Sequence, residues 1–398
     1  MSHVAVGSSR VPATVWALGF VSLFMDLSSE MIHAVLPLFL VTTLGASTAI
    51  VGLIEGVAEA TASIAKAFSG WLSDRLGNRK WITVAGYALA AFAKPVFALA
   101  VTPYEVLGAR FADRIGKGIR GAPRDALVAD VTAPEARGVA YGVRQALDTV
   151  GAFLGPLAAI LLMLASGGDM RAVFAWAVVP ALVSVAIAIF AVKDPARPKA
   201  KGGERPPIRF ADIRHAGFAF WMVAAIGSAF TMARFSEAFL VLRAQNVGVA
   251  LAYAPAVMVV MSIAYALTSG PAGAWSDRTD RRRILALSLA PLLLADLALA
   301  LWPSVIGVMS GVVLWGIHMG MSQGLLAALV ADTVSEHQRG TAFGVFNLIT
   351  GVALFFASFL AGALWQSFGP AATFLAGGGF ALLSLSILVL VLLRPRRR

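Results

Sequence analysis

The chain has 398 residues, of which 59% are hydrophobic and 13% charged, and its formal net charge is +11. Soluble domains average about 25% charged residues, so this composition excludes an ordinary soluble fold. Apolar stretches of roughly 20 residues recur along the whole chain, each long enough to cross a bilayer as a helix. The absence of cysteine excludes disulfides and thiolate metal sites.

Twelve stretches are predicted to be membrane-spanning helices, separated by Gly/Pro/Ser clusters and charged runs. In chain order they cover residues 12–42, 47–72, 81–101, 104–129, 138–165, 171–192, 215–242, 249–275, 283–302, 304–331, 339–365 and 370–393. The first stretch is too long for a cleavable signal peptide. We expect an all-α integral membrane protein with an N-terminal six-helix bundle (1–192), a hydrated cytoplasmic linker rich in Pro, Gly and charge (193–214) and a C-terminal six-helix bundle (215–398).

The 32 lysines and arginines sort by side of the membrane. Most of them fall at the two termini, in the linker and in the loops after even-numbered helices, whereas the opposite loops hold Arg171 and Arg243. The positive-inside rule therefore predicts a multi-pass protein of a bacterial-type cytoplasmic (inner) membrane with both termini in the cytoplasm. Because the positive charge is explained as a topology signal, we do not expect a nucleic-acid partner.

The two halves of the sequence resemble each other. The segment Gly70–Lys80 matches Gly273–Arg283, and Ala126–Val143 matches Ala328–Val345 at the same offset within one residue. Two similar six-helix halves in the same orientation imply a pseudo-twofold axis along the membrane normal.

The stretch Asp113–Asp125, "DRIGKGIRGAPRD", carries six charges inside a predicted span. The repeat aligns it with the uncharged segment Trp315–Ala327, whose composition predicts a membrane span. If Asp113–Asp125 were a loop, the first half would have one helix fewer than the second. At about 2.5–3.5 kcal/mol for each central charge, six charges facing lipid would cost on the order of 15–20 kcal/mol. This helix is therefore predicted to face protein or water.

Other charged residues fall within predicted spans of the N-terminal half. Arg110, Arg114, Lys117 and Arg124 share one face of the charged helix, with Arg120 at its edge. The candidates for substrate binding or proton coupling are Asp26, Glu30, His33, Glu55, Glu59, Arg110, Asp113, Arg114, Lys117, Arg120, Arg124, Arg144, Asp148, Arg234 and Glu237. The C-terminal half is sparse and adds only polar positions such as Asp296, His318, Gln323 and Asn347.

Two interpretations of these charges stay open. They either neutralise one another in a buried lattice that positions the helices, or some arginines bind an anionic group while a carboxylate carries a proton. No second histidine follows His33 or His318 at helical metal-site spacing. We therefore expect neither a metal site nor a cofactor.

The loop after the second predicted helix resembles the signature of the major facilitator superfamily, and the resemblance covers essentially the whole chain. The residues that match or accompany this gating motif are Gly70, Asp74, Arg75, Gly77, Arg79, Asp130 and Arg137, with Asp277, Arg278 and Arg281 in the second copy. Asn78 and Asp280 depart from the motif. The resemblance implies that these arginines pair with carboxylates such as Asp130 when the bundles close on the cytoplasmic side.

The fifth predicted helix carries Gly142, Gly151, Gly155 and Pro156, similar to the motif of drug or metabolite:proton antiporters in this superfamily. Ala159 and Ile160 replace its last two glycines. The resemblance implies export, whereas glycines at this spacing also serve ordinary close packing of helices.

These features predict a secondary active transporter, and not an enzyme, that works by alternating access. We expect it to act as a monomer, with a small-molecule substrate, protons and the lipid bilayer as partners. The favoured function is proton-coupled efflux of a small organic molecule, with an anionic or drug-like substrate. The alternatives are proton-coupled uptake of an organic anion and, more remotely, a non-transporting membrane sensor or an intramembrane enzyme.

Overall fold

The computed structural model describes residues 11–76, 78–194, 217–334 and 339–393, which are helical almost throughout. The N-terminal half comprises α1 (Ala13–Leu38), its π-helical extension η1 (Phe39–Thr43), α2 (Thr48–Leu76), α3 (Arg79–Leu99), α4 (Pro103–Val131), the short η2 (Pro134–Ala136), α5 (Arg137–Ala165) and α6 (Met170–Phe190). The C-terminal half comprises α7 (Phe218–Met232), α8 (Ala238–Asn246), η4 (Leu251–Tyr253), α9 (Ala256–Ser276), α10 (Arg281–Leu301), α11 (Val305–Ser322), α12 (Leu325–Thr333), α13 (Arg339–Phe368) and α14 (Pro370–Leu393).

Within the described residues these helices make up the twelve predicted spans. Ten are long and apolar enough to cross a membrane by length and composition. The eleventh is α4, which has 29 residues and carries the charged stretch, and the twelfth is the short apolar α7 continued by α8. The predicted fold class is confirmed. The boundaries between bundles and linker stay a prediction, because residues 195–216 lie outside the described part of the chain.

Two predicted spans are not continuous, and here the sequence prediction was wrong. The span predicted at 215–242 stops at Met232 and resumes at Ala238. The backbone N–H of Ser236 in this break donates to the Ser358 hydroxyl oxygen at 3.2 Å, and that of Ala238 donates to the Ser236 hydroxyl oxygen at 3.2 Å. Irregular backbone is tolerated at membrane depth when protein satisfies its polar groups in this way.

The span predicted at 304–331 is interrupted at Gln323 and Gly324. Gly324 has φ of +71°, a left-handed conformation that glycine adopts without the steric cost of a Cβ atom. The sequence pattern missed this break because the apolar run continues through it.

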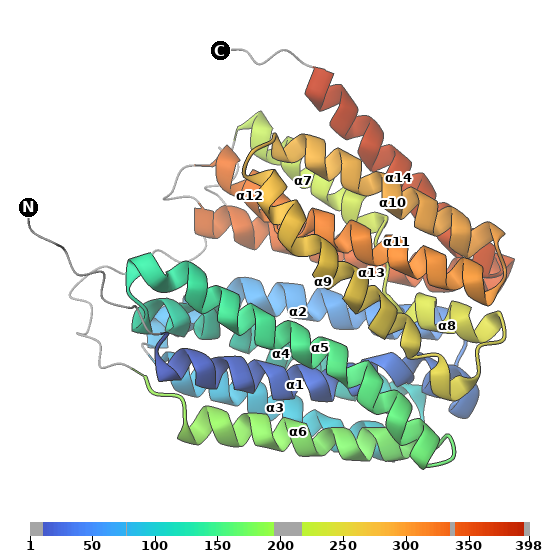
Figure 1. Cartoon of the computed structure of the whole chain (residues 1–398), viewed down its shortest axis with the longest axis horizontal. Helices are drawn as coiled ribbons and strands as arrows, with labels where there is room; N and C mark the ends of the chain where they lie inside the picture. Colours follow the sequence, from blue (N-terminus) through green and yellow to red (C-terminus); the bar gives the residue numbers. More distant parts are fainter. Residues whose placement is uncertain (1–10, 77, 195–216, 335–338, 394–398) are drawn as a thin grey trace, which may run out of the picture.

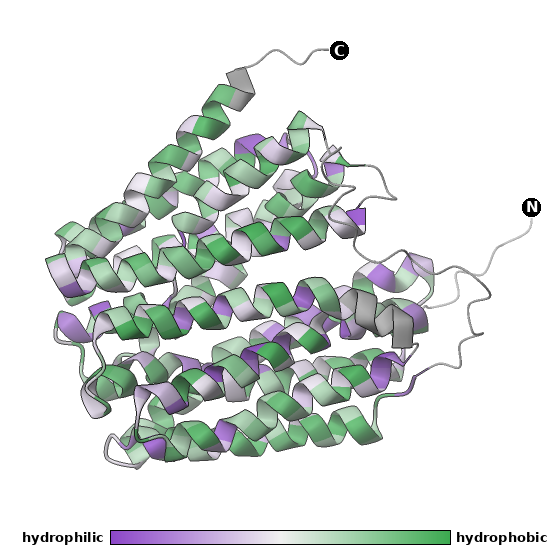
Figure 2. Cartoon of the chain, turned by 180° about the vertical axis from the view of Figure 1, so that it is seen from behind, coloured by the Kyte–Doolittle hydropathy of each residue, from purple (hydrophilic) through white to green (hydrophobic). Residues whose placement is uncertain are grey.

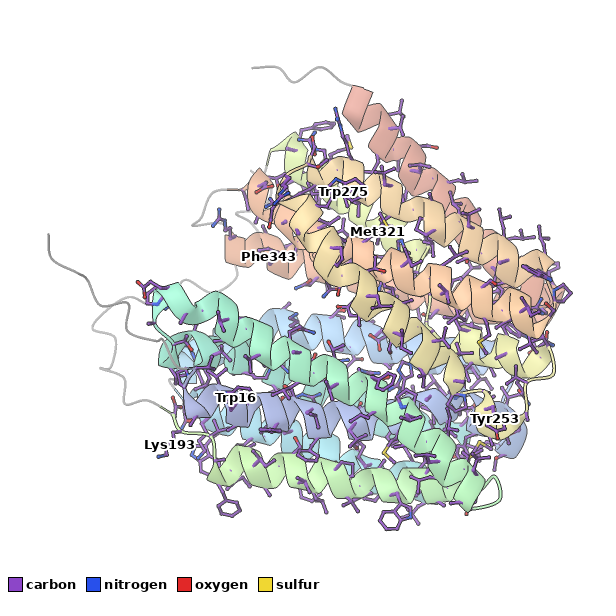
Figure 3. The ribbon with its side chains drawn as sticks, viewed as in Figure 1. Trp16, Lys193, Tyr253, Trp275, Met321 and Phe343 are labelled. Atoms are coloured by element: carbon purple, nitrogen blue, oxygen red, sulfur yellow. The ribbon has the colours of Figure 1, made fainter. Side chains whose placement is uncertain are left out.

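The two halves lie side by side and diverge toward one end (Figure 1). Trp16, Lys193 and Trp275 lie at the end where the halves diverge, which we call the linker end (Figure 3). Tyr253 lies at the opposite, distal end, where η4 contacts α5.

The halves meet mainly where α2 packs along α13. Gly52 of α2 lies against the backbone of Ser358 and Gly362, and the Thr48 hydroxyl donates to the Gly362 carbonyl oxygen at 3.3 Å. Glycines let helix backbones approach closely in membranes. Further along this seam, Ser63 of α2 packs against Gly351 of α13. Because the halves are in contact at Thr48 and diverge toward the linker end, the bundle is closed at its distal end (Figure 1).

The glycines of the fifth predicted helix have different surroundings. Gly151 lies against the backbone of Leu23 on α1, and a Cβ atom at Gly155 would stand 2.6 Å from Glu30 Cβ. Gly142 faces open space. Two glycines of this motif therefore allow α1 and α5 to pack together, which is the packing interpretation of the motif.

Hydropathy follows the helix arrangement (Figure 2). Hydrophobic colouring dominates the outer helices, while hydrophilic positions recur along helices inside the N-terminal half. The charged residues of this half therefore lie among its own helices, as the cost of charges in lipid predicted.

Replacing Gly155 by alanine is expected to destabilise the protein. The added methyl group would meet Glu30 Cβ and the Leu27 carbonyl oxygen, and such overpacking costs about 1–3 kcal/mol. Thermal unfolding of the purified protein in detergent measures the effect. Gly142→Ala on the same helix is the matched control, and equal stability of the two variants would contradict the packing role.

Candidate functional site

The charged residues of α4 pair with different neighbouring helices. Toward α2, Arg110 NH2 donates hydrogen bonds to Glu55 Oε1 at 2.9 Å and to Glu55 Oε2 at 2.7 Å. Both side chains are buried. One turn on, Arg114 NH2 lies 3.2 Å from Glu59 Oε1. A charge-assisted pair of this kind is stronger than a neutral hydrogen bond and has a defined geometry. These contacts hold α2 and α4 in one register.

Toward α3, the same helix presents Asp113 and Arg120. Lys94 Nζ lies 2.8 Å from Asp113 Oδ1 and donates to the Ser29 hydroxyl of α1 at 2.9 Å. Arg120 stacks over the Tyr87 ring, with its guanidinium carbon 4.5 Å from the ring centroid. This second face of α4 is therefore held against α3 by an ion pair and a cation–π contact, and Lys94 of that ion pair also contacts α1.

At the linker end of α4, Arg124 bridges α1 and α5. Its NH1 donates to the Ser22 hydroxyl at 3.1 Å and lies 3.9 Å from Asp148 Oδ1. Asp148 also lies 3.6 Å from Arg144 NH1 on its own helix. The N-terminal candidates predicted from sequence thus converge on one charged layer around α4.

Glu55 links this layer to the other half. His33 lies between two carboxylates, with Nδ1 3.5 Å from Glu30 and Nε2 3.6 Å from Glu55. The Ser236 hydroxyl, in the break between α7 and α8, donates to Glu55 Oε2 at 3.2 Å. We call Glu55, Arg110, Ser236 and Ser358 the distal latch, because these buried groups join the halves at the closed end.

Two carboxyl groups lie near each other between α1 and α5. They are the Asp26 side chain on α1 and the Asp148 side chain on α5. Two ionised carboxylates this close repel each other, and that repulsion favours a proton on one of them. The sequence placed both residues inside the membrane but did not indicate that they meet.

Two cations of the layer have no carboxylate oxygen within 4 Å among the described residues, namely Lys117 and Arg120. Lys117 is exposed to solvent inside the bundle and interacts electrostatically with Asp26, Glu30, Glu59 and Asp148. Arg120 is buried, and its NH1 has no hydrogen-bond partner within the described part of the chain. Of the two, Lys117 is the one that solvent reaches, whereas Arg120 has an unused donor in a buried position.

Among the described residues, the candidates of the C-terminal half form no ion pair with the charged layer. Arg234 and Glu237 flank the break between α7 and α8, where Arg234 interacts electrostatically with Glu237 and with Tyr265 of α9. Ser236, between them, is the residue that contacts the N-terminal half. Sequence reasoning missed it because a lone serine in an apolar run carries no signal of its own.

The signature loops contain an equivalent ion pair in each half. Arg79 pairs with Asp130, and Arg281 NH1 lies 2.8 Å from Asp332 Oδ2 at the corresponding position of the repeat. Asn78 and Asp280, the departures from the motif, both cap the helix that follows them. The expectation that the pair with Asp130 forms only when the halves close is corrected, since Arg79 and Asp130 belong to the same half.

Other motif residues have less defined surroundings. Arg137, Asp277 and Arg278 are exposed at the linker end. Gly70, Asp74 and Arg75 belong to the last turns of α2, whose side chains lie outside the described part of the structure, as does Gly77 altogether.

Comparison with known proteins agrees with this architecture. The chain is 30% identical over 384 residues to an uncharacterized MFS-type transporter from Methanocaldococcus jannaschii, with 95% of this chain and 94% of the relative covered. The crystal structure of the nucleoside transporter NupG superposes with a TM-score of 0.75 at 14% identity, covering 96% of this chain and 100% of that one. An inward-facing, unoccupied bacterial homolog of the human lysosomal transporter Spinster gives 0.71 at 17% identity, covering 96% of each chain.

The family model described as Major Facilitator Superfamily matches residues 18–244 and 235–398, which together include both six-helix halves. The repeat, the twelve spans and the paired loops at the linker end are all features of one architecture. This chain therefore belongs to the major facilitator superfamily of membrane transporters, which are not enzymes.

Proposed function

We propose that this transporter moves a small organic anion together with a proton by alternating access. The observation that carries the proposal is the position of Lys117 and Arg120, cations without a carboxylate within 4 Å among the described residues, beside the Asp26–Asp148 pair. The four side chains come from α1, α4 and α5 of one charged layer.

The anionic character of the substrate follows from the pairing. Glu55, Glu59 and Asp113 are each matched by a cation on a neighbouring helix, so these carboxylates are not free to bind a substrate cation. Lys117 is reached by solvent and would donate to a carboxylate or phosphate of the substrate, as ammonium groups commonly do. Hydrophobic walls of the cavity would take up the remainder of a small organic molecule.

Proton and substrate are coupled because the Asp26–Asp148 pair and the anionic substrate compete for Lys117. When the Asp26–Asp148 pair is fully ionised, its extra negative charge attracts Lys117 and repels an anionic substrate. When the pair holds a proton, Lys117 is released and the substrate binds more tightly. By linkage, a substrate whose affinity is raised by the proton also raises the affinity for the proton. The two ligands therefore travel together, and an inward proton gradient drives uptake.

Proton-coupled efflux is the second candidate, favoured by the Gly142, Gly151, Gly155 and Pro156 motif. Export against an inward proton gradient requires that proton and substrate exclude each other. A cationic substrate that binds to Asp26 or Asp148 would meet this requirement, because protonation removes the charge to which it binds. The sign of the pH effect on substrate affinity distinguishes the two candidates.

The orientation of the bundle completes the proposal. With both termini in the cytoplasm, as the positive-inside rule predicts, the closed distal end faces outward and the diverging linker end faces inward. The distal latch then separates when the halves rock to the outward-open state. Its hydrogen bond from Ser236 to Glu55 is made only in the inward-open state, so it stabilises that state.

The decisive measurement is flux into proteoliposomes under an imposed pH gradient, with a panel of organic anions, zwitterions and lipophilic cations. We expect saturable uptake of an anion that accelerates when the outside is made acidic, and tighter binding of that anion as pH falls. Tighter binding of a cation as pH rises would instead establish the efflux candidate. Saturable flux that ignores the gradient would refute proton coupling.

Lys117→Gln is expected to weaken binding of the transported anion. Loss of a hydrogen bond to a charged group costs about 1.5–3 kcal/mol, which corresponds to roughly 10–100-fold in affinity. Binding of the anion to purified protein measures the effect. Lys193→Gln, at the exposed linker end, is the matched control, and unchanged affinity in Lys117→Gln would show that this lysine does not bind the substrate.

Ser236→Ala is expected to shift the protein toward the distal-open state. The lost hydrogen bond has an ionised acceptor and is worth about 1.5–3 kcal/mol, so the population ratio should change roughly tenfold or more. Because the chain has no cysteine, spin labels at Thr43→Cys and Ser367→Cys report the distal separation, and labels at Val139→Cys and Arg278→Cys report the linker end. The distal distance should increase while the other decreases. Unchanged distributions at both ends would show that the latch does not hold this state.

A further inference from the structure

Asp296 is a buried carboxyl group that the transport site does not use. It lies on α10 in the C-terminal half and is 1% exposed. Neither of its oxygens has a hydrogen-bond partner among the described residues, and it makes no ion pair there. Burial of a carboxyl group without any partner is rare and costly in a membrane protein, so its presence needs a physical explanation.

The carboxyl group sits directly against the backbone of α14. A Cβ atom at Gly377 would lie 3.2 Å from Asp296 Oδ2 and 2.8 Å from the edge of the Phe235 ring. At Gly378 the corresponding distance to Asp296 Cβ is 3.6 Å. The absence of a side chain at Gly377 thus leaves room for the Asp296 carboxyl group, and the Phe235 ring, from the break between α7 and α8, lies against the same position.

Other aromatic rings pack against Phe235. The Phe235 ring lies 5.5 Å from Trp315 of α11 and 5.7 Å from Phe374 of α14, measured between centroids. Trp315 is fully buried, and its indole nitrogen has no partner among the described residues. The side chains around Phe235 are therefore aromatic and apolar.

The charged and titratable groups near Asp296 have other partners. In the break that carries Phe235, Arg234 interacts electrostatically with Glu237 and with Tyr265 of α9. On α11, His318 contacts the Ser288 carbonyl oxygen at 2.6 Å, about two turns from Asp296. On α8, Arg243 donates to the Leu299 carbonyl oxygen and to Asn246. On α12, Asp332 pairs with Arg281 at the linker end, and the α14 sequence contains no charged residue or histidine.

We propose that Asp296 is a second proton-binding site, which holds a proton while the distal latch is closed and exchanges it when the latch opens. An isolated ionised carboxylate at such a site would be far more costly than its neutral form, because no cation or hydrogen-bond donor compensates for the lost water. The proton is therefore the ligand that this space accommodates.

Exchange requires a route for the proton, and the break between α7 and α8 provides the moving part. Phe235 and Asp296 both lie against Gly377 of α14, while the next residue after Phe235, Ser236, donates to Glu55 of the other half. When the halves separate at the distal end, the break between α7 and α8 changes its position relative to α2. Because Phe235 and Ser236 are consecutive residues, the Phe235 ring moves when the distal latch opens. Opening of the latch would then let water reach Asp296 and ionise it.

The burial of Asp296 without a partner supports its protonation in the closed state independently of the proposed function. Its contribution to transport, in contrast, rests on the proposed proton coupling. The two parts are separated by two measurements on the full-length protein. The first is infrared difference spectroscopy in lipid nanodiscs at neutral pH. We expect the carbonyl absorption of protonated carboxylic acids to lose one component in Asp296→Asn relative to wild type, and that component to shift in Asp296→Glu.

The matched control is Asp169→Asn, because asparagine also caps the helix that Asp169 caps, and it should leave the band unchanged. A carbonyl absorption that is identical in wild type and Asp296→Asn would overturn the proposal. If Asp296→Asn does not fold, the shift of the band in Asp296→Glu decides the assignment, and an unshifted band overturns it.

The second measurement is the number of protons moved per substrate in proteoliposomes. Asp296→Asn is expected to lower this number by one while it retains substrate affinity, since the residue lies outside the transport site. If Asp296→Asn loses its component of the infrared absorption but moves the same number of protons per substrate as wild type, the proposed exchange is overturned. Asp296 would then keep its proton throughout transport. Wild-type flux without any proton movement would refute the proposed coupling, and with it the exchange at Asp296, but not the assignment of the infrared band.

Discussion

A charge inside a membrane must be matched by another charge or reached by water, and the N-terminal half of this protein is organised by that requirement. The charged face of α4 cannot contact lipid at an acceptable cost, so α1, α2, α3 and α5 surround it with carboxylates and hydroxyls. Breaking a buried pair such as Arg110–Glu55 leaves an uncompensated charge. The pairs therefore hold these helices in one relative position.

A site arises where this matching is incomplete. Lys117 and Arg120 lie among acids but form no close ion pair within the described residues, and the carboxyl groups of Asp26 and Asp148 lie near each other. A rigid lattice with a few unmatched charges is well suited to transport, because its electrostatic balance changes when a proton or an anion enters. The C-terminal half has few charges and instead supplies the irregular backbone at the α7–α8 break.

Much of the site was predictable from residue spacing, and its connections were not. Helical periodicity placed Arg110, Arg114, Lys117 and Arg124 on one face of a helix, and all of them lie in the charged layer. Spacing cannot say which neighbouring helix each one meets, because that depends on how the helices rotate and tilt against each other. The contacts of Asp26 with Asp148 and of Ser236 with Glu55 join residues far apart in the chain. The glycine motif likewise predicted close packing but not that Gly142 would face open space.

The sequence by itself determined the membrane class, the twelve spans, the two-fold repeat and the inward orientation of the charged helix. Each of these follows from the cost of transferring a residue from water to lipid, which is a property of composition along the chain. Only the tertiary structure decided where two spans break, which charges pair and which remain available, and that Asp296 is buried near Phe235 without a partner among the described residues. These depend on contacts between distant segments, whose free energies appear only when the helices have packed.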